Sequence, residues 1–172
     1  TSSAYTLPRL TINAASSPLL QPGPSGQGYT FVGLEMRWQC GVSNTNFLAR
    51  INAAAGQTQT ASNLPKRFMF DRVWAHGCGH GTNVASMYRI AGPGHVFVDS
   101  YLHDSYNTGA ERQCISGIEQ PTNILVENCF LACAGENIGF GGSKPSSGVL
   151  NGSDALIHKN HFVYQLYWWS GH

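Results

Sequence analysis

Five segments of the chain repeat one arrangement of hydrophobic and polar positions. They are residues 31–36, 70–75, 98–103, 126–131 and 157–162. The first position is always an apolar, strand-forming residue, and the sixth is apolar in every copy except the one that ends at His103. Polar side chains hold the second and third positions in most copies. The arrangement predicts two short strands joined by a tight turn.

The spacing of these segments predicts the fold. Their first positions are separated by 39, 28, 28 and 31 residues. Three short strands and three turns fit about 28 residues, the length of one parallel β-helix coil, whereas a propeller blade needs about 40–45. We therefore expect an all-β chain in which residues 1–172 form a single solenoid of about five coils. The one pattern that favours a helix, at residues 46–55, lies in the 39-residue spacing and predicts a short helical insertion.

Few residues of the chain are charged. Lys, Arg, Asp and Glu make up 11% of positions, against about 25% in a typical soluble domain. Stacked coils place equivalent side chains about 4.8 Å apart, where like charges repel, so a solenoid favours uncharged polar residues. The composition also argues against a disordered chain and against a nucleic-acid-binding protein. No apolar run approaches the roughly 20 residues of a membrane span.

The five cysteines suggest one disulfide bond. Cys40 and Cys78 lie nine and eight residues into consecutive copies of the repeat. They should be neighbours on adjacent coils, which predicts a Cys40–Cys78 disulfide, with two free buried thiols as the alternative. The spacing of Cys114, Cys129 and Cys133 assigns no partner and matches no zinc motif. Five cysteines, few lysines and many Ser, Thr and Asn residues favour an extracellular or cell-surface location.

Several motifs resemble those of a known group of proteins. The most specific is Gly-Glu-Asn-Ile-Gly-Phe-Gly-Gly at residues 135–142, and further matching stretches are residues 7–10, 29–36, 70–77 and 153–162. Together they resemble secreted bacterial right-handed parallel β-helix proteins of the pectate-lyase-like superfamily. The resemblance implies a right-handed coil and a chain that is a segment of a longer solenoid. Because that superfamily includes polysaccharide lyases, hydrolases and epimerases as well as surface and tail-fibre proteins, the resemblance leaves the activity open.

A cluster of titratable residues follows the sixth position of the repeat. His76 and Asp104 hold the same seventh position in neighbouring copies, so we expect a hydrogen bond between them. A His–Asp pair with a further carboxylate, such as Glu136, is suited to general acid–base catalysis. The alternative is that these groups only satisfy one another and order the turns, with Glu136 and Asn137 bonding backbone amides of the next coil. Other polar residues expected on this side are His80, His103, Glu111 and Arg112.

Three carboxylates share the second position of successive copies. Asp71, Asp99 and Glu127 would form a ladder of oxygen ligands, which suits Ca²⁺. The alternative is a solvated turn whose charges are compensated by neighbouring residues such as Arg72.

Aromatic residues gather at the end of the sequence. Tyr164, Tyr167, Trp168 and Trp169 lie within six positions. They suit a carbohydrate platform, packing beneath a following coil, or a subunit contact.

These observations define two classes of function. The first is an extracellular or cell-surface β-helix protein with a carbohydrate-related or structural role and a polysaccharide as partner. The alternative is a polysaccharide lyase, hydrolase or epimerase-like enzyme, or a fibre-forming subunit whose coils stack end to end. None of the residues forms a recognisable catalytic motif.

Overall fold

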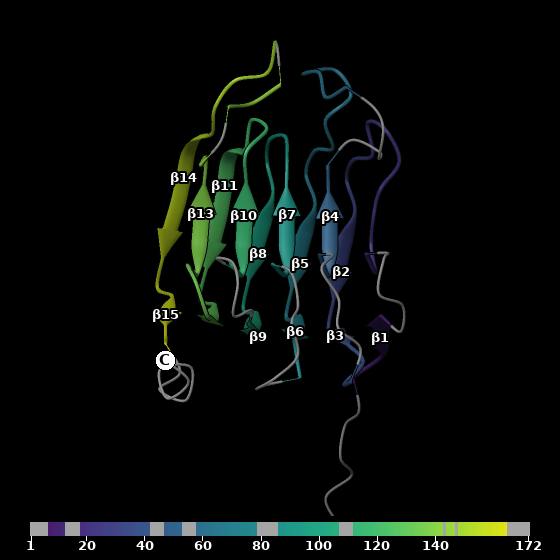
Figure 1. Ribbon diagram of the computed structural model, residues 1–172, viewed down its shortest axis with the longest axis vertical. Coiled ribbons are helices and arrows are strands. Elements are labelled where there is room, and N and C mark those ends of the chain that lie inside the picture. The colour runs from purple at the N-terminus through teal and green to yellow at the C-terminus, as the bar shows by residue number, and fades with distance from the viewer. Residues whose placement is uncertain are drawn as a thin grey trace, which may run out of the picture.

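In the computed structural model the chain forms three parallel β-sheets that wind around one hydrophobic core (Figure 1). The structure describes residues 7–12, 18–41, 47–52, 58–78, 86–106, 112–142, 144–146 and 148–164, and these contain strands and turns but no helix. Successive strands pass from sheet to sheet in a repeating order. The protein is therefore a β-solenoid of about five coils, as the repeat predicts.

Each complete coil contributes one strand to each sheet, and the first and last coils contribute to fewer. The six-stranded sheet contains β1 (Arg9–Ile12), β3 (Glu35–Trp38), β6 (Trp74–His76), β9 (Tyr101–Ser105), β12 (Phe130–Cys133) and β15 (His161–Phe162). The five-stranded sheet contains β2 (Thr30–Val32), β5 (Met69–Asp71), β8 (Val96–Val98), β11 (Thr122–Glu127) and β14 (Ser153–His158). The four-stranded sheet contains β4 (Ala49–Ile51), β7 (Tyr88–Ile90), β10 (Ile115–Gly117) and β13 (Ile138–Phe140).

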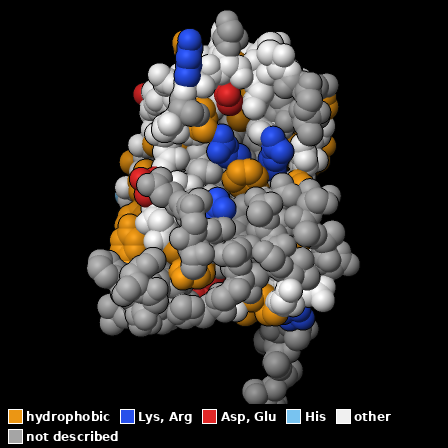
Figure 2. Space-filling view, viewed as in Figure 1, with side chains coloured by type: hydrophobic (Ala, Val, Ile, Leu, Met, Phe, Trp, Pro, Cys, Tyr) orange, Lys and Arg blue, Asp and Glu red, His pale blue; other side chains and the backbone are white. Residues whose placement is uncertain are grey.

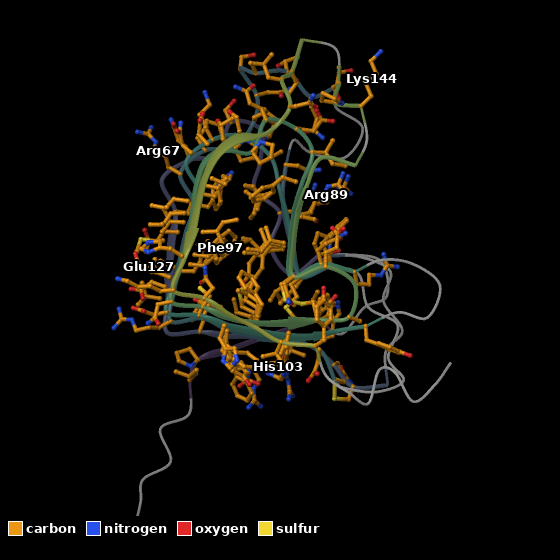
Figure 3. The ribbon with its side chains drawn as sticks, turned by 90° about the vertical axis from the view of Figure 1, so that its left-hand side faces the viewer. Arg67, Arg89, Phe97, His103, Glu127 and Lys144 are labelled. Carbon is orange, nitrogen blue, oxygen red and sulfur yellow. A yellow bond between two sulfur atoms is a disulfide. The ribbon has the colours of Figure 1, made fainter. Side chains whose placement is uncertain are left out.

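The solenoid is right-handed. In Figure 1 the strands of the four-stranded sheet point upward and β14 of the five-stranded sheet points downward. Figure 3 looks along the axis from the C-terminal side, with Arg89 of the four-stranded sheet on the right, Glu127 of the five-stranded sheet on the left and His103 of the six-stranded sheet below. The chain circles counterclockwise as it advances toward the viewer, which is the sense of a right-handed coil.

The turn between the five-stranded and six-stranded sheets explains the polar third position of the repeat. One residue in each of these turns has a left-handed backbone with φ between 50° and 62°. These residues are Gly33, Arg72, Asp99, Asn128 and Lys159. Glycine, Asn and Asp adopt this conformation more readily than other residues, so the predicted pair of short strands joined by a tight turn is confirmed.

The register of one copy differs from the prediction by one residue. Phe70 pairs with Phe97, and Phe97 pairs with Val126, so the third copy begins at Phe97 rather than at Val98. The two steps of the coil are therefore 27 and 29 residues instead of 28 and 28. This shift moves Asp99 from the second position of the repeat to the third, which holds the left-handed turn residue, and changes the register partners of Val98 and of residues 101–103.

The predicted helical insertion at residues 46–55 is wrong where the structure describes it. Ala49–Ile51 is strand β4, which pairs in parallel with β7. Ala49 and Ile51 point into the core and are fully buried, whereas Arg50 between them points outward. This alternation has the period of a strand, so burial against the neighbouring coil outweighs the helix-forming alanines nearby.

The predicted Cys40–Cys78 disulfide is present, with a Cα–Cα distance of 5.3 Å. A second disulfide joins Cys114 and Cys133, with a Cα–Cα distance of 5.5 Å. It links the residue before β10 of the four-stranded sheet to the last residue of β12 in the six-stranded sheet, a contact that the repeat does not reveal. Cys129 is free and buried, and burial raises the pKa of its thiol to about 11.

Candidate functional site

Aromatic side chains form a row on the outer face of the six-stranded sheet. Trp74, Tyr101, Phe130 and His161 hold equivalent outward positions on β6, β9, β12 and β15, and we call them the aromatic ladder. The rings of Tyr101 and Phe130 stack with 4.3 Å between their centroids, and the His161 ring lies edge-on to Phe130 at 5.2 Å. Parallel pairing of the coils places these side chains in one row across the strands.

The exposure of this row is unusual for the molecule. Trp74 is 37% and Tyr101 is 43% exposed. Every other exposed large hydrophobic side chain of the described residues lies on or beside the edge strands β1, β2, β14 and β15. Trp74 and Tyr101 are therefore the two that the middle of the solenoid presents to solvent without a terminal coil to explain them.

Histidines form a second row beside the ladder. His76 and His103 are register partners, and their rings stack at 5.3 Å with an angle of 8° between planes. The Trp74 ring stacks on His76 at 4.3 Å. Figure 3 shows His103 on the outer side of this sheet, below the core that contains Phe97. The two rows together make a surface of flat rings with nitrogen atoms at their edges.

Hydrogen bonds fix the tautomer of His103. The indole Nε1–H of Trp74 donates to His103 Nε2 over 2.8 Å, so Nε2 carries no proton in this arrangement. His103 Nδ1 then carries the proton and donates it to Asp104 Oδ2 over 2.7 Å. Asp104 is the extra residue of a β-bulge and has a φ of 63°. The bulge turns its carboxylate toward the preceding histidine.

His76 lies between two oxygen acceptors. Its Nε2 is 3.2 Å from Glu35 Oε1, and its Nδ1 is 2.8 Å from the Gly77 carbonyl oxygen. A neutral imidazole donates to only one of these acceptors, whereas a doubly protonated ring donates to both. Both nitrogens of His76 are therefore occupied within the protein.

Glu35 is the buried carboxylate of this surface. Arg9 Nε donates to its Oε2 over 2.7 Å, while His76 contacts its other oxygen. Burial by itself would raise the pKa of Glu35, but the bonds to Arg9 and His76 outweigh this effect and hold the pKa below its ordinary value. Glu35 is thus a fixed negative charge beside the ladder.

The predicted hydrogen bond between His76 and Asp104 is not formed. The one-residue shift in register makes His103 the neighbour of His76, and Asp104 bonds to His103 instead. The two predicted residues still lie close together. The backbone of Gly77, which follows His76, approaches the Asp104 carbonyl oxygen so closely that a side chain at Gly77 would collide with it. The prediction therefore located these residues near one another but assigned Asp104 to His76 instead of to His103.

Glu136 lies outside this cluster. It sits between the six-stranded and four-stranded sheets and lines a groove over the latter. Asn137 acts as the predicted turn anchor, since its Oδ1 accepts the Cys133 N–H over 2.9 Å. The bonded amide belongs to its own coil, not to the next one. His80 and Glu111 lie outside the described residues.

The three carboxylates of the predicted calcium ladder do not share one column. Val98 stands in register between Asp71 and Glu127, and Asp99 lies in the turn. Each carboxylate has a protein partner: Arg72 bonds Asp71, Asn128 bonds Asp99, and Lys159 bonds Glu127. Among the described residues, no three His, Cys, Asp or Glu side chains are placed to hold a metal ion.

Tyr164 lies at the C-terminal end of the described solenoid. It lines a cavity of about 450 Å³ together with Ile138, Ile157 and Phe162. Tyr167, Trp168 and Trp169, the other aromatic residues predicted to make contacts, fall outside the described part of the chain.

The sequence contains a signal for the aromatic ladder that the displaced register of the third copy hides. With the third copy in its true register, the fifth position of the repeat reads Glu35, Trp74, Tyr101, Phe130 and His161. The displaced register put Leu102 in this column and interrupted the run of rings.

The fold places the protein in the class of parallel β-solenoids. Comparisons with protein-family models, with curated proteins and with solved structures found no match to the chain. None of the described residues belongs to a helix that could span a membrane.

Proposed function

We propose that this protein is an extracellular or cell-surface solenoid that binds a polysaccharide along the aromatic ladder. The observation that carries the proposal is the exposure of Trp74 and Tyr101 in the middle of the solenoid, where the other large hydrophobic side chains are covered. Aromatic rings beside well-placed polar groups are a common lining of ligand sites. The apolar faces of sugar rings pack against such side chains while their hydroxyl groups bond the polar ones.

The neighbouring row supplies the polar groups. The edges of His76 and His103, with the carboxylates of Glu35 and Asp104, lie beside the rings. Adjacent coils are about 4.8 Å apart, so a chain of sugars lying across the strands would meet a ring and a polar group on successive coils. The two disulfides support an oxidising compartment such as the cell exterior.

The same geometry favours binding over catalysis. A general base needs a nitrogen or oxygen atom that faces the proton it removes. His103 Nε2 is occupied by Trp74, and both nitrogens of His76 face protein acceptors. Incubation with a polysaccharide panel, followed for unsaturated products and new reducing ends, should therefore show no turnover. Turnover that disappears in His103→Ala would overturn this choice.

We expect Trp74→Ala and Tyr101→Ala each to weaken binding about 10-fold or more, because Trp and Tyr are the residues whose truncation costs most at binding surfaces. A glycan array identifies the ligand, and titration calorimetry measures its affinity for each variant. Tyr29→Ala is the matched control, since Tyr29 is more exposed than either ladder residue but lies beside β2, an edge strand of the five-stranded sheet. Equal losses in the control and the ladder variants would contradict the proposal.

End-to-end association is a second candidate function, favoured by the exposed side chains of the terminal coils. Ile157 and Phe162 continue the buried columns of Val126 and Leu131, yet they are 39% and 48% exposed. Leu10 likewise continues the column of Met36 and is exposed at the opposite end. An uncovered coil also presents unpaired backbone groups to a further strand. The partner we propose is a second copy of the chain, stacked head to tail.

The double variant Ile157→Lys/Phe162→Lys is expected to lower this association, because two charges would lie in the apolar contact. Sedimentation velocity at rising protein concentration measures it. Tyr101→Lys places one such charge in the middle of the solenoid and should leave association unchanged. A wild-type chain that stays monomeric at every concentration excludes this candidate.

A further inference from the structure

A groove of about 330 Å³ runs over the outer face of the four-stranded sheet. It lies on a different face from the aromatic ladder, and none of the ladder residues lines it. Lys and Arg side chains gather near the middle of the face that looks out from this sheet (Figure 2). The residues that matter for its chemistry are Arg89, Gln113, Ser116, Glu136 and Gly139.

Arg89 is the distinctive side chain of the groove. It is the outward residue of β7, and Figure 3 shows it on the outer side of the sheet. Its guanidinium forms no hydrogen bond or ion pair with any of the described residues; it lies 5.7 Å above the Phe47 ring. A guanidinium has five N–H donors and is costly to leave half-buried without acceptors. An arginine that lines a groove and has no acceptor among the described residues therefore suits a bound acceptor.

The surroundings of Arg89 favour an anion as that acceptor. Arg50 is its register partner on β4, so two positive charges occupy adjacent coils. Burial and the nearby Arg50 both lower the pKa of Arg89, which reflects the cost that a bound negative charge would relieve. The charge of Glu119 offsets this lowering only in part, and its carboxylate bonds the backbone amide and hydroxyl of Ser146 rather than Arg89.

The other end of the groove carries neutral and acidic groups. Ser116 and Gly139 continue the outward column of Arg89 on the next two coils, and their small size leaves the groove open. Glu136 Oε2 and the Gln113 amide lie over Gly139, where an added Cβ would contact them. Gln113 Oε1 accepts the Ser86 hydroxyl, so its NH₂ group faces the groove as a donor. One acceptor and one donor here suit hydroxyl groups.

We propose that this groove binds a hydroxylated ligand that carries a single oxyanion, such as a sugar acid or a sulfated sugar. Arg89 bonds the oxyanion, while Gln113, one coil away, and Glu136, two coils away, bond hydroxyl groups. The carboxylate of Glu136 repels a second negative charge, so the site prefers a monoanion to a polyanion. Because the groove and the ladder lie on different sheets, ligand binding in the groove can be tested independently of polysaccharide binding on the ladder.

The test is titration of the folded chain with galacturonate, galactose 6-sulfate, neutral galactose and inorganic sulfate, followed by NMR and calorimetry. At least one of the two acidic sugars should bind with shifts at Ser116 and Gly139, and comparison of the two separates a carboxylate from a sulfate ester. Galactose and inorganic sulfate should bind at least 10-fold more weakly, since each lacks one half of the recognised chemistry. Equal binding of all four probes, or no binding of either acidic sugar, overturns the proposal.

Arg89→Gln should weaken binding about 10- to 100-fold, the range expected for a lost charge-assisted hydrogen bond. Arg72→Gln is the matched control, because Arg72 is bonded to Asp71 on another sheet, and it should bind as the wild type does. Gly139→Val fills the groove without changing charge and should also abolish binding, which guards against a folding defect in the first variant. Trp74→Ala should leave this binding intact. Unchanged affinity in both Arg89→Gln and Gly139→Val would overturn the proposal.

Discussion

Replacing Phe97 by alanine is expected to lower the free energy of unfolding by about 3–5 kcal/mol, the usual cost of removing a buried phenylalanine ring. Phe31, Phe70 and Phe97 stack along the inside of the five-stranded sheet with centroid distances of 5.2 and 5.1 Å. The Tyr88 ring packs edge-on against Phe97 at 5.0 Å from the four-stranded sheet. Phe97 is fully buried, so its removal leaves a cavity between the five-stranded and four-stranded sheets. The cavity also removes contacts with the neighbouring coils.

Urea unfolding followed by circular dichroism measures this loss, and Phe130→Ala provides the control. Phe130 undergoes the same chemical change on the outer face of the six-stranded sheet, where it is only partly buried. Its variant should lose clearly less stability, and Phe97→Leu should fall between Phe97→Ala and the wild type. Similar losses for Phe97→Ala and Phe130→Ala would show that the internal stack does not hold the coils together.

The sequence predicted the solenoid because its turns recur in a recognisable form. An apolar residue, a polar turn with a left-handed backbone and a second apolar residue return in every coil, and these features depend on local chemistry. The register of the third copy did not follow from the same pattern. Phe97 and Val98 are adjacent and both form strands well, so the sequence alone left the choice of inward residue undetermined.

The error in register had consequences for the site. The prediction paired His76 with Asp104. In the structure Asp104 is the extra residue of a bulge and accepts a hydrogen bond from the preceding residue, His103. A bulge inserts one residue and moves every later side chain to the opposite face of a strand. The spacing of residues in the sequence does not reveal this bulge, because its position depends on how neighbouring coils pack. The location of the cluster was therefore predictable, but its hydrogen bonds were not.

The two disulfides differ in the same way. Cys40 and Cys78 occupy nearly equivalent places in consecutive copies, so stacking alone brought them together in the prediction. Cys114 and Cys133 belong to different sheets and meet at a corner of the coil. Their contact depends on the angle between two sheets, which the repeat does not specify.

A second large effect is expected on acidification, through His95. This residue is fully buried beneath Phe68, and no feature of the repeat marks it. The Phe68 backbone N–H donates to His95 Nδ1 over 3.3 Å, and His95 Nε2–H donates to the Ala91 carbonyl oxygen over 2.9 Å. A proton on Nδ1 would face another N–H group. Burial lowers the pKa of His95 to about 4, and the bond to Ala91 offsets this only in part.

The pKa of the same histidine in the unfolded chain is about 6.5, so the unfolded state binds the proton more readily than the folded state. The stability of the protein should therefore be complete above pH 6.5 and should fall as the pH drops from 6.5 to about 4. At 1.36 kcal/mol per pKa unit, the loss from this one group reaches about 3 kcal/mol at the acid end. Glu35, whose pKa is held below its ordinary value of 4.5, adds its own loss only in the lower part of this range.

Denaturant unfolding at several pH values between 7 and 5 measures this loss where few carboxylates titrate, and comparison with a His95 variant isolates the contribution of His95. His95→Gln keeps a neutral polar side chain, and its stability should depend much less on pH across this interval, whatever its stability at pH 7. His161→Gln, a change at an exposed histidine of the aromatic ladder, should retain the wild-type slope. An NMR titration in which the His95 ring protonates near pH 6.5 in the folded protein would contradict this account. It would mean that the folded protein gives up the bond from the Phe68 N–H and buries the charged ring without the expected cost.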